Sequence, residues 1–310
     1  MGQIHRLIVD KGIEEARRIA ETQPNNAMLQ LNAAHTVLSD DTDSMGVTHA
    51  GFAMAALPHR KTDDLVWKRE NGPTKLLVES GRNSDETLVG IPYGATARMI
   101  LLYLQTQAVR NQSREIELGG SMQAWLTAMG LAKGGKTYQS VKEQAKRVSR
   151  CRLTFFHTSA DGDFVSNGAF VRDAILPATG DGKQSSLWRE TVVLDEMFYN
   201  SLVQHALPLR ESAIREISNR SMAIDIYVWL AYRLHHLQKP TPITWTALHA
   251  QFSTGPRELR FFKRDIRSSL ELALAVYPEA KVGIDDKAGL VLHPSPPPIS
   301  KRGRIYKIGA

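Results

Sequence analysis

The sequence of 310 residues lacks the features that mark several classes of protein. It contains one cysteine, Cys151, which excludes an internal disulfide and a cysteine-rich zinc site. Because Cys151 lies in the apolar run CRLTFF, we expect a buried and unreactive thiol. No apolar run approaches the roughly 20 residues of a membrane-spanning helix, and the N-terminus has no signal-peptide pattern. These absences predict a cytoplasmic protein that is not bound to a membrane.

Residues that could support catalysis or bind a metal are present, but they form no recognisable motif. The pair His235-His236 ends an apolar helical pattern and lacks the spacing of metal ligands. No Ser-His-Asp signature is visible, although a triad assembled only in space would leave no such signal. The acidic residues form no convincing catalytic set: Asp41, Asp195, Glu196, Asp285 and Asp286. We therefore expect a protein that is not an enzyme and needs no metal or cofactor.

Positive charge is in excess, and it is concentrated in three segments. The formal net charge is +7, with an isoelectric point near 9.5. Residues 133–152 carry a net charge of +6, residues 255–267 carry +3 and residues 300–310 carry +4, so the rest of the chain is acidic. This clustering favours a polyanionic partner more strongly than the total charge does.

The first 88 residues show little regular pattern. GIEEARRIAETQ at 12–23 predicts a helix, and SDDTDSMGVTHAG at 39–51 is polar and acidic, as loops are. LVWKRENGPTKLLVES at 65–80 alternates apolar and polar residues around Asn71-Gly72, which predicts a hairpin.

Two similar series of elements follow. From Pro92 the pattern is helix, strand (REIEL), a helix capped by Ser121, a turn, a basic helix and two strands around an Asp-Gly turn. A long apolar helix over 214–237 begins the second series, followed by TPIT, a short helix, a turn, another basic helix and two strands. This is the order of a winged helix-turn-helix module. The sequence thus predicts an α+β fold with an N-terminal region (1–88) and two tandem winged-helix domains (89–206 and 207–310).

One motif offers a different interpretation. Gly130–Thr137 matches the nucleotide-binding P-loop pattern, and TVVLDE at 191–196 has the form of a magnesium-binding Walker B strand. A P-loop, however, needs a buried strand before the glycines and a helix after them. The preceding SMQAWLTAM has helical apolar spacing, so we expect a turn between two helices and treat a P-loop ATPase as the weaker alternative.

Both basic helices separate apolar and cationic residues onto different faces of a helical wheel. In the first, Tyr138, Val141, Ala145 and Val148 form the apolar face; in the second, it is Leu259, Phe262, Ile266, Leu270 and Ala273. Solvated helix faces are often charged. Solvation alone, however, does not explain why a cationic helix face occurs twice, each time after a short helix and a turn. Such a helix suits the major groove of duplex DNA. The predicted DNA-binding residues are Lys136, Gln139, Lys142, Lys146, Arg147, Arg150, Arg257, Arg260, Lys263, Arg264 and Arg267.

From about Leu57 onward the chain resembles the plasmid-encoded RepA replication initiators. The resemblance rests on LPHRKTDDLVWKRENGPTKLLVES, on GIPYGATARMILLYLQTQAVRNQSREIELGGSMQAWL and on GGKTYQSVKEQAKRVSRCRLTFF. It implies two winged-helix domains that recognise directly repeated double-stranded origin DNA, with the basic helices as the contacts. It also implies origin opening, recruitment of the host initiator and replicative helicase, a possible homodimer, repression of its own gene and a part in plasmid copy control. The residues alone fit a transcriptional repressor equally well, because both proteins need the same helices.

Overall fold

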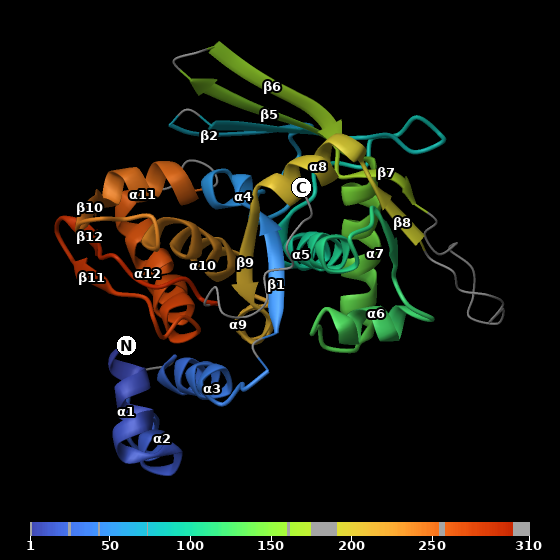
Figure 1. Cartoon of the computed structure of the whole chain (residues 1–310). Coiled ribbons are helices and arrows are strands. Elements are labelled where there is room, and N and C mark those ends of the chain that lie inside the picture. Colours follow the sequence, from blue (N-terminus) through green and yellow to red (C-terminus); the bar gives the residue numbers. More distant parts are fainter. Residues whose placement is uncertain are drawn as a thin grey trace. The chain divides into compact units, whose positions relative to one another are not determined.

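The computed structural model describes residues 2–23, 26–42, 44–72, 74–159, 162–174, 191–253 and 258–299. The chain forms two compact units (Figure 1). We call residues 47–206 the middle unit, and residues 1–46 together with 207–310 the composite unit. Residues 1–88, predicted as one N-terminal region, are therefore divided between both units.

The middle unit contains a winged-helix arrangement of helices and a small sheet. Strand β4 pairs with β8, and β8 pairs with β7, all antiparallel. Helix α5 buries most of its residues from Ala97 to Leu104, so it forms the core of the unit. The elements are α5 (Gly94–Asn111), β4 (Glu115–Glu117), α6 (Met122–Ala128), α7 (Gly135–Arg150), β7 (Val171–Ala174), β8 (Thr191–Leu194) and α8 (Glu196–Gln204).

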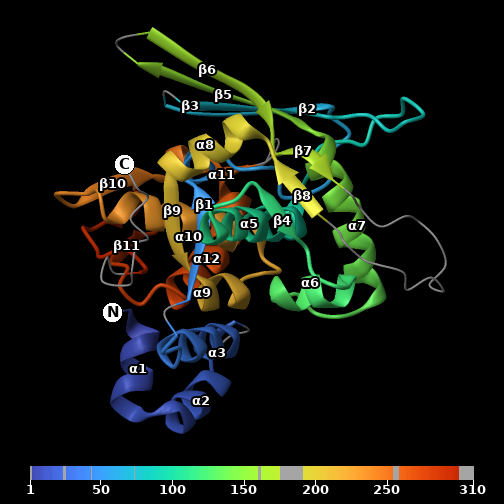
Figure 2. The same cartoon turned by 45° about the vertical axis from the view of Figure 1, so that its right-hand side comes forward.

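A second sheet in this unit has the strand order β2-β3-β5-β6 and is antiparallel throughout (Figure 2). Its strands are β2 (Val66–Asn71), β3 (Thr74–Glu79), β5 (Arg152–Ser159) and β6 (Gly162–Ala169). The hairpin predicted at Asn71-Gly72 is confirmed, with Gly72 at φ 57°. Assigning the strands after α7 to the wing was wrong, because β5 pairs with β3, a partner over 70 residues upstream, and buries Leu153 beside Val78. The strands of the wing are β7 and β8, and their connection lies outside the described residues.

The composite unit repeats the winged-helix plan. Strands β10, β12 and β11 pair in that order, which matches the order β4-β8-β7 of the middle unit. In both sheets the strand before the helix-turn-helix lies beside the last strand, so the predicted tandem winged-helix fold is confirmed. The elements are α9 (Glu211–Glu216), α10 (Ser221–Leu234), β10 (Thr241–Thr244), α11 (Trp245–Phe252), α12 (Leu259–Ala275), β11 (Val282–Asp285) and β12 (Gly289–Leu292). The single helix predicted over 214–237 is two helices, because Arg220 leaves the helical conformation at φ −123°, ψ 84°.

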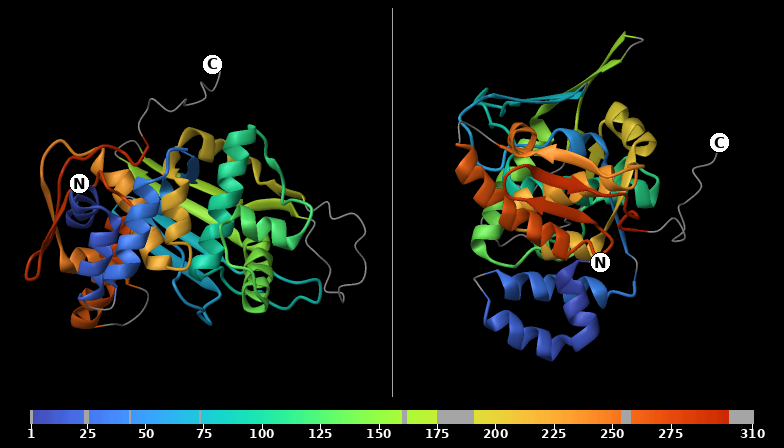
Figure 3. Two further views of the ribbon diagram at one scale, coloured as in Figure 1. Left: turned by 90° about the horizontal axis from the view of Figure 1, so that it is seen from below. Right: turned by 90° about the vertical axis from the view of Figure 1, so that its left-hand side faces the viewer.

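Three N-terminal helices belong to this unit and pack against the C-terminal half of α12 (Figure 3). They are α1 (Gln3–Lys11), α2 (Ile13–Glu21) and α3 (Ala27–Leu38). Their buried side chains include Ile8 and Leu31, which cluster with Ala275 of α12. Asn26 Nδ2 donates to Ser268 Oγ at 2.8 Å, and Gln30 Nε2 donates to Glu271 Oε2 at 3.1 Å. The helix predicted over 12–23 is thus confirmed as α2.

The loop predicted over 39–51 is wrong in its second half. Strand β1 (Met45–His49) pairs with β9 (Ala206–Arg210), and the short helix α4 (Gly51–Met54) follows it. Val47 N donates to Thr106 Oγ1 at 2.9 Å, and His49 N donates to Gln105 Oε1 at 2.7 Å. A polar sequence is therefore buried because polar side chains of α5 satisfy its backbone.

Candidate nucleic-acid interface

Helix α7 presents most of the first predicted DNA-binding face to solvent. Val141, Ala145 and Val148 are buried, as the wheel predicts, and hold the helix against the unit. The exposed residues on the other side are Lys136, Gln139, Lys142, Lys146 and Arg150. The helix is preceded by α6, which Ser121 caps by accepting from Ala124 N at 3.1 Å, and by a turn at Gly130 (φ 69°).

Arg147, predicted to be on this outward face, is instead buried, with 7% of its surface exposed. Its Nη1 donates to the carbonyl oxygen of Ile91 at 3.0 Å, and its Nε donates to Glu143 Oε1 at 3.1 Å. The guanidinium carbon lies 5.2 Å from the centre of the Tyr93 ring. Arg147 therefore fixes α7 to the segment before α5 and cannot reach DNA from this position.

The same segment holds α7 through a second buried polar residue. Tyr93 N donates to Gln144 Oε1 at 2.9 Å, and Gln144 is 1% exposed. Gly90, at φ 81°, lies against the Arg147 guanidinium so closely that a Cβ atom would collide with it. The wheel missed these roles because the partners come from more than 50 residues upstream and cover a face that a lone helix would expose.

The loop over residues 81–90 borders the C-terminal end of α7. Arg150 Nη1 donates to Asn83 Oδ1, and Gly81 packs against the carbonyl group of Arg150 without room for a side chain. Asn83 in turn is held by a hydrogen bond from its Nδ2 to Thr87 Oγ1 at 2.7 Å. This loop is part of the surface around α7, and no sequence pattern predicted it.

The P-loop interpretation fails on geometry. Gly130 follows helix α6, whereas a phosphate-binding loop follows a buried strand. Asp195, the proposed metal-binding residue of the Walker B pattern, is the N-cap of α8, where its Oδ1 accepts from Phe198 N at 3.1 Å. The segment Gly130–Thr137 is the turn and first helical residues of a helix-turn-helix.

Helix α12 carries the second face. Phe262, Ile266, Leu270 and Ala273 are buried as predicted. Leu259 was placed with them, but it is 37% exposed because it is the first residue of the helix and lies beyond the core. On the basic face, Arg260 and Arg264 are exposed, while Lys263 and Arg267 are half-buried. Arg257 lies outside the described residues, as does the basic tail 300–310.

The arginines of α12 are paired with carboxylates. Arg260 Nε lies 2.8 Å from Glu258 Oε2, and Arg264 Nε lies 3.3 Å from Asp265 Oδ1. Arg267 contacts the carboxylate of Asp286, which belongs to the turn between β11 and β12. Within the residues that the structure describes, Lys136, Lys142 and Lys146 of α7 form no ion pair with a carboxylate. The two faces thus differ: α7 offers unpaired ammonium groups, and α12 offers guanidiniums that must exchange a partner to bind DNA.

The wing of the composite unit is tied to α12. Asp285 Oδ1 accepts from Lys287 N and Ala288 N at 2.8 and 2.7 Å, which closes the turn and lowers the pKa of Asp285. Trp245 Nε1 donates to the Asp285 carbonyl at 3.0 Å, and Lys263 Nζ donates to the Asp286 carbonyl at 3.3 Å. These contacts fix the acidic wing tip beside the basic face of the helix.

One side chain of α12 adds a feature that sequence reasoning missed. Phe261 is 39% exposed, and two guanidinium carbons lie over its ring, that of Arg260 at 4.6 Å and that of Arg264 at 5.8 Å. A helical wheel places Phe261 away from the apolar face of α12. This position is the sequence signal that could have identified it as an exposed aromatic residue.

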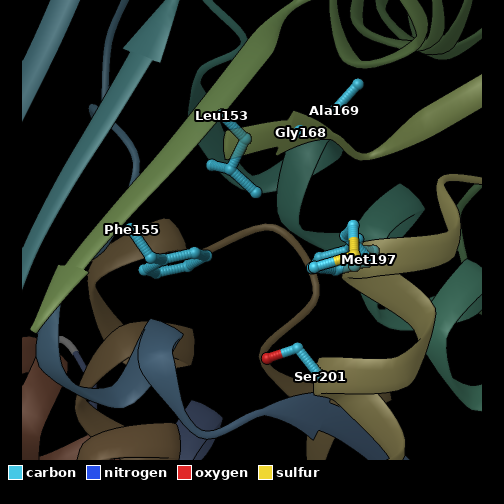
Figure 4. A pocket seen from close by; sticks show the side chains of 7 residues that line it. Leu153, Phe155, Gly168, Ala169, Met197 and Ser201 are labelled. Carbon is cyan, nitrogen blue, oxygen red and sulfur yellow. The ribbon is translucent and has the colours of Figure 1, made fainter. Parts of the chain in front are cut away.

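A small apolar pocket in the middle unit lies between β5, the end of β6 and α8 (Figure 4). Its lining residues are Leu153, Phe155, Gly168, Ala169, Met197, Phe198 and Ser201. Its free volume of about 10 Å³ is at most that of one water molecule. The pocket is therefore too small for a nucleotide or a similar ligand.

His49 contacts Phe155 and Ser201, two residues that line this pocket, and is 7% exposed. Its ring stacks on Phe155 with centres 5.4 Å apart, its Nδ1 accepts from Gly51 N at 2.9 Å, and its Nε2 lies 2.9 Å from Ser201 Oγ. Because Nδ1 is an acceptor, the neutral ring carries its proton on Nε2 and donates it to Ser201. This tautomer cannot remove a proton from Ser201, so the pair is structural.

Burial, together with the nearby His205, lowers the pKa of His49 to about 4. In the unfolded chain His49 becomes protonated near pH 6.5, whereas in the folded chain it stays neutral down to about pH 4. We expect the free energy of unfolding to fall as pH decreases through this window, by up to about 3 kcal/mol. Denaturant titrations between pH 4 and 8 should show a flatter profile for His49→Asn than for the unmodified chain. Identical profiles would contradict this assignment.

The remaining sequence predictions concern buried or absent features. Cys151 is buried, and burial raises the pKa of its thiol to about 12. No group of three potential metal ligands occurs in the described part of the chain. None of the helices described is both long and apolar enough to cross a membrane.

Comparison with known proteins decides the family. Residues 91–246, half of the chain, match the model of the family described as plasmid encoded RepA protein. The chain belongs to the plasmid-encoded RepA family. It is thus a member of a family of plasmid replication initiators, and the matched region runs from the segment before α5 into the first residues of α11.

Solved structures similar to this RepA-family chain are those of RctB. RctB domains 2-3 match with a TM-score of 0.50 and 15% identity, over 78% of this chain and 94% of that one. A second structure, of selenomethionine derivatives of RctB domains 2 and 3, matches with a TM-score of 0.48 and 14% identity, over 71% and 82%. At this identity the first likeness supports the fold alone. No curated protein sequence matches the chain significantly.

Proposed function

We propose that this RepA-family protein starts plasmid replication by binding directly repeated origin DNA through both winged-helix domains. The observation that supports the proposal most is the repeated strand order, with a basic helix after the turn each time: α7 in β4-β8-β7 and α12 in β10-β12-β11. In a winged-helix module this helix enters the major groove. One polypeptide would thus engage two successive stretches of major groove in a single repeat.

The two modules have complementary parts in this binding. The unpaired lysines of α7 act as point charges on phosphates, whereas the planar guanidiniums of α12 can contact guanine in two places. Linking two modules raises the effective concentration of each at its site, so modest affinities combine. Each phosphate neutralised should lower the logarithm of the binding constant by about 0.9 per tenfold increase in salt.

Binding to the repeats would drive the later steps. Energy from both modules can bend or open a neighbouring AT-rich segment without nucleotide hydrolysis, and the opened origin would receive the host initiator and the replicative helicase. A homodimer bound beside the promoter of its own gene would also repress that gene, and would so contribute to plasmid copy control.

Footprinting on the DNA that flanks the gene tests the proposal. We expect protection of several direct repeats next to an AT-rich segment, each repeat protected over two successive major-groove faces. Protection of one palindrome at a promoter would instead indicate a transcriptional repressor. Protection from the composite unit alone would contradict engagement of both domains, and no protection would refute sequence-specific binding.

A further inference from the structure

Phe261 is an exposed aromatic residue that lies among the arginines of α12 and the carboxylates paired with them. It lies in the first turn of α12, and 39% of it is exposed. The neighbouring Phe262, by contrast, is 2% exposed and packs edge-on against His249 with ring centres 4.9 Å apart. Phe262, and not Phe261, therefore fills the core at this point of the helix. The presence of an aromatic side chain at the exposed position 261 needs another explanation.

The surroundings of Phe261 indicate what it faces. Arg260 and Arg264 lie over its ring with guanidinium carbons at 4.6 and 5.8 Å. A guanidinium that stacks on a ring still presents its N–H groups at its edge, so both arginines can donate to DNA once they exchange Glu258 and Asp265 for it. A purely apolar partner would bury these two exposed ion pairs away from water, which is costly, whereas a nucleic acid offers acceptors to both guanidiniums. The mixture of one ring and two guanidiniums therefore suits the major groove.

The main apolar group that base edges present in the major groove is the 5-methyl group of thymine. Side chains in the first turns of a recognition helix approach the base edges. We infer that Phe261 reads thymine by contacting this methyl group, while Arg260 and Arg264 bind adjacent positions. The inference rests on the proposed function, because it assumes that α12 enters the groove of the origin repeat.

Replacement of single thymines by deoxyuridine tests this directly, because it removes the methyl group and leaves the base pairing unchanged. Each thymine of one footprinted repeat would be replaced in turn, and the dissociation constant measured for the full-length protein. With the unmodified protein, we expect about fourfold weaker binding at one or two positions, the value of one buried methyl group. With Phe261→Ala, deoxyuridine at those positions should have no further effect.

Two control variants make the result specific. Phe261→Leu keeps an apolar contact but removes the ring beneath the arginines, so it should stay sensitive to deoxyuridine if the methyl contact is what matters. Val9→Ala truncates another exposed apolar residue of the same unit, 61% exposed on α1, and should behave as the unmodified protein does. The inference is overturned if no thymine position is sensitive, or if Phe261→Ala is as sensitive as the unmodified protein. Failure of the unmodified protein to bind the repeats would refute the proposed function itself.

Discussion

Replacing Arg260 and Arg264 together with alanine is expected to reduce the preference for origin repeats over random DNA by about 30-fold or more. A good two-point contact between arginine and guanine contributes about 1–3 kcal/mol of discrimination, and two such contacts would be lost. Both residues are exposed on α12, and burial does not explain their presence. The double variant should therefore stay folded while binding the repeats more weakly.

The affinity of the double variant for random DNA should fall less than its affinity for the repeats, because carboxylates already pair with these arginines. In the free protein Arg260 pairs with Glu258 and Arg264 with Asp265, both near the surface. Non-specific binding would replace these carboxylates by phosphates, with a small gain, since exposed ion pairs contribute little. Only a guanine contact adds something that the intramolecular pair lacks. Competition binding with repeat and random duplexes at one salt concentration measures the ratio.

The matched variant is Lys142→Ala with Lys146→Ala on α7. Both lysines are exposed, and in the described part of the chain neither has a carboxylate oxygen within 4 Å, so they are expected to bind phosphates. This variant should lose affinity equally for both DNAs, and its salt slope should fall by about 1.8. If the arginine variant also lost affinity equally for both, Arg260 and Arg264 would be phosphate contacts and not base readers.

Replacing Arg147 with methionine should destabilise the middle unit by about 3 kcal/mol. Its guanidinium, almost fully buried, donates to Ile91 and Glu143, and hydrogen bonds of a charged group contribute about 1.5–3 kcal/mol. Methionine fills a similar volume but leaves the Ile91 carbonyl without its donor. Denaturant unfolding, monitored by tryptophan fluorescence, measures the loss.

The neighbouring Lys146→Met is the control, because Lys146 is exposed and an exposed substitution typically changes stability by less than about 0.5 kcal/mol. A second variant, Arg147→Lys, keeps the charge but loses the forked geometry, and should be destabilised to a lesser degree. A stable Arg147→Met variant with weakened DNA binding would show that Arg147 contacts DNA after all.

Local patterns were enough to predict most of the elements. The hairpin at Asn71-Gly72, the cap at Ser121, the turn at Gly130 and the two amphipathic helices all depend on neighbours within a few residues. The repeated order of elements predicted the tandem winged-helix fold for the same reason. Trp125, Trp229 and Trp245, which stand at apolar positions of their helical patterns, are each at most 2% exposed.

Three of the errors share one cause, a partner distant in the sequence. Arg147 is buried because Ile91 and Tyr93, over 50 residues upstream, contact it. Strand β5 is not part of the wing because it pairs with β3. Strand β1 looks like a loop until β9 and the side chains of α5 satisfy its backbone. In each case a contact over many residues changed the environment that the local pattern implied.

By itself the sequence determined most helices and strands of the two winged-helix domains, that two of the helices are cationic, and that the order of elements repeats. Periodicity and charge are local properties, so a chain carries them before it folds. Only the tertiary structure decided which cations face solvent, which of them are already paired with acids, and that Phe261 lies among them. Those properties depend on what is brought next to each side chain, and the fold brings together residues that the sequence keeps far apart.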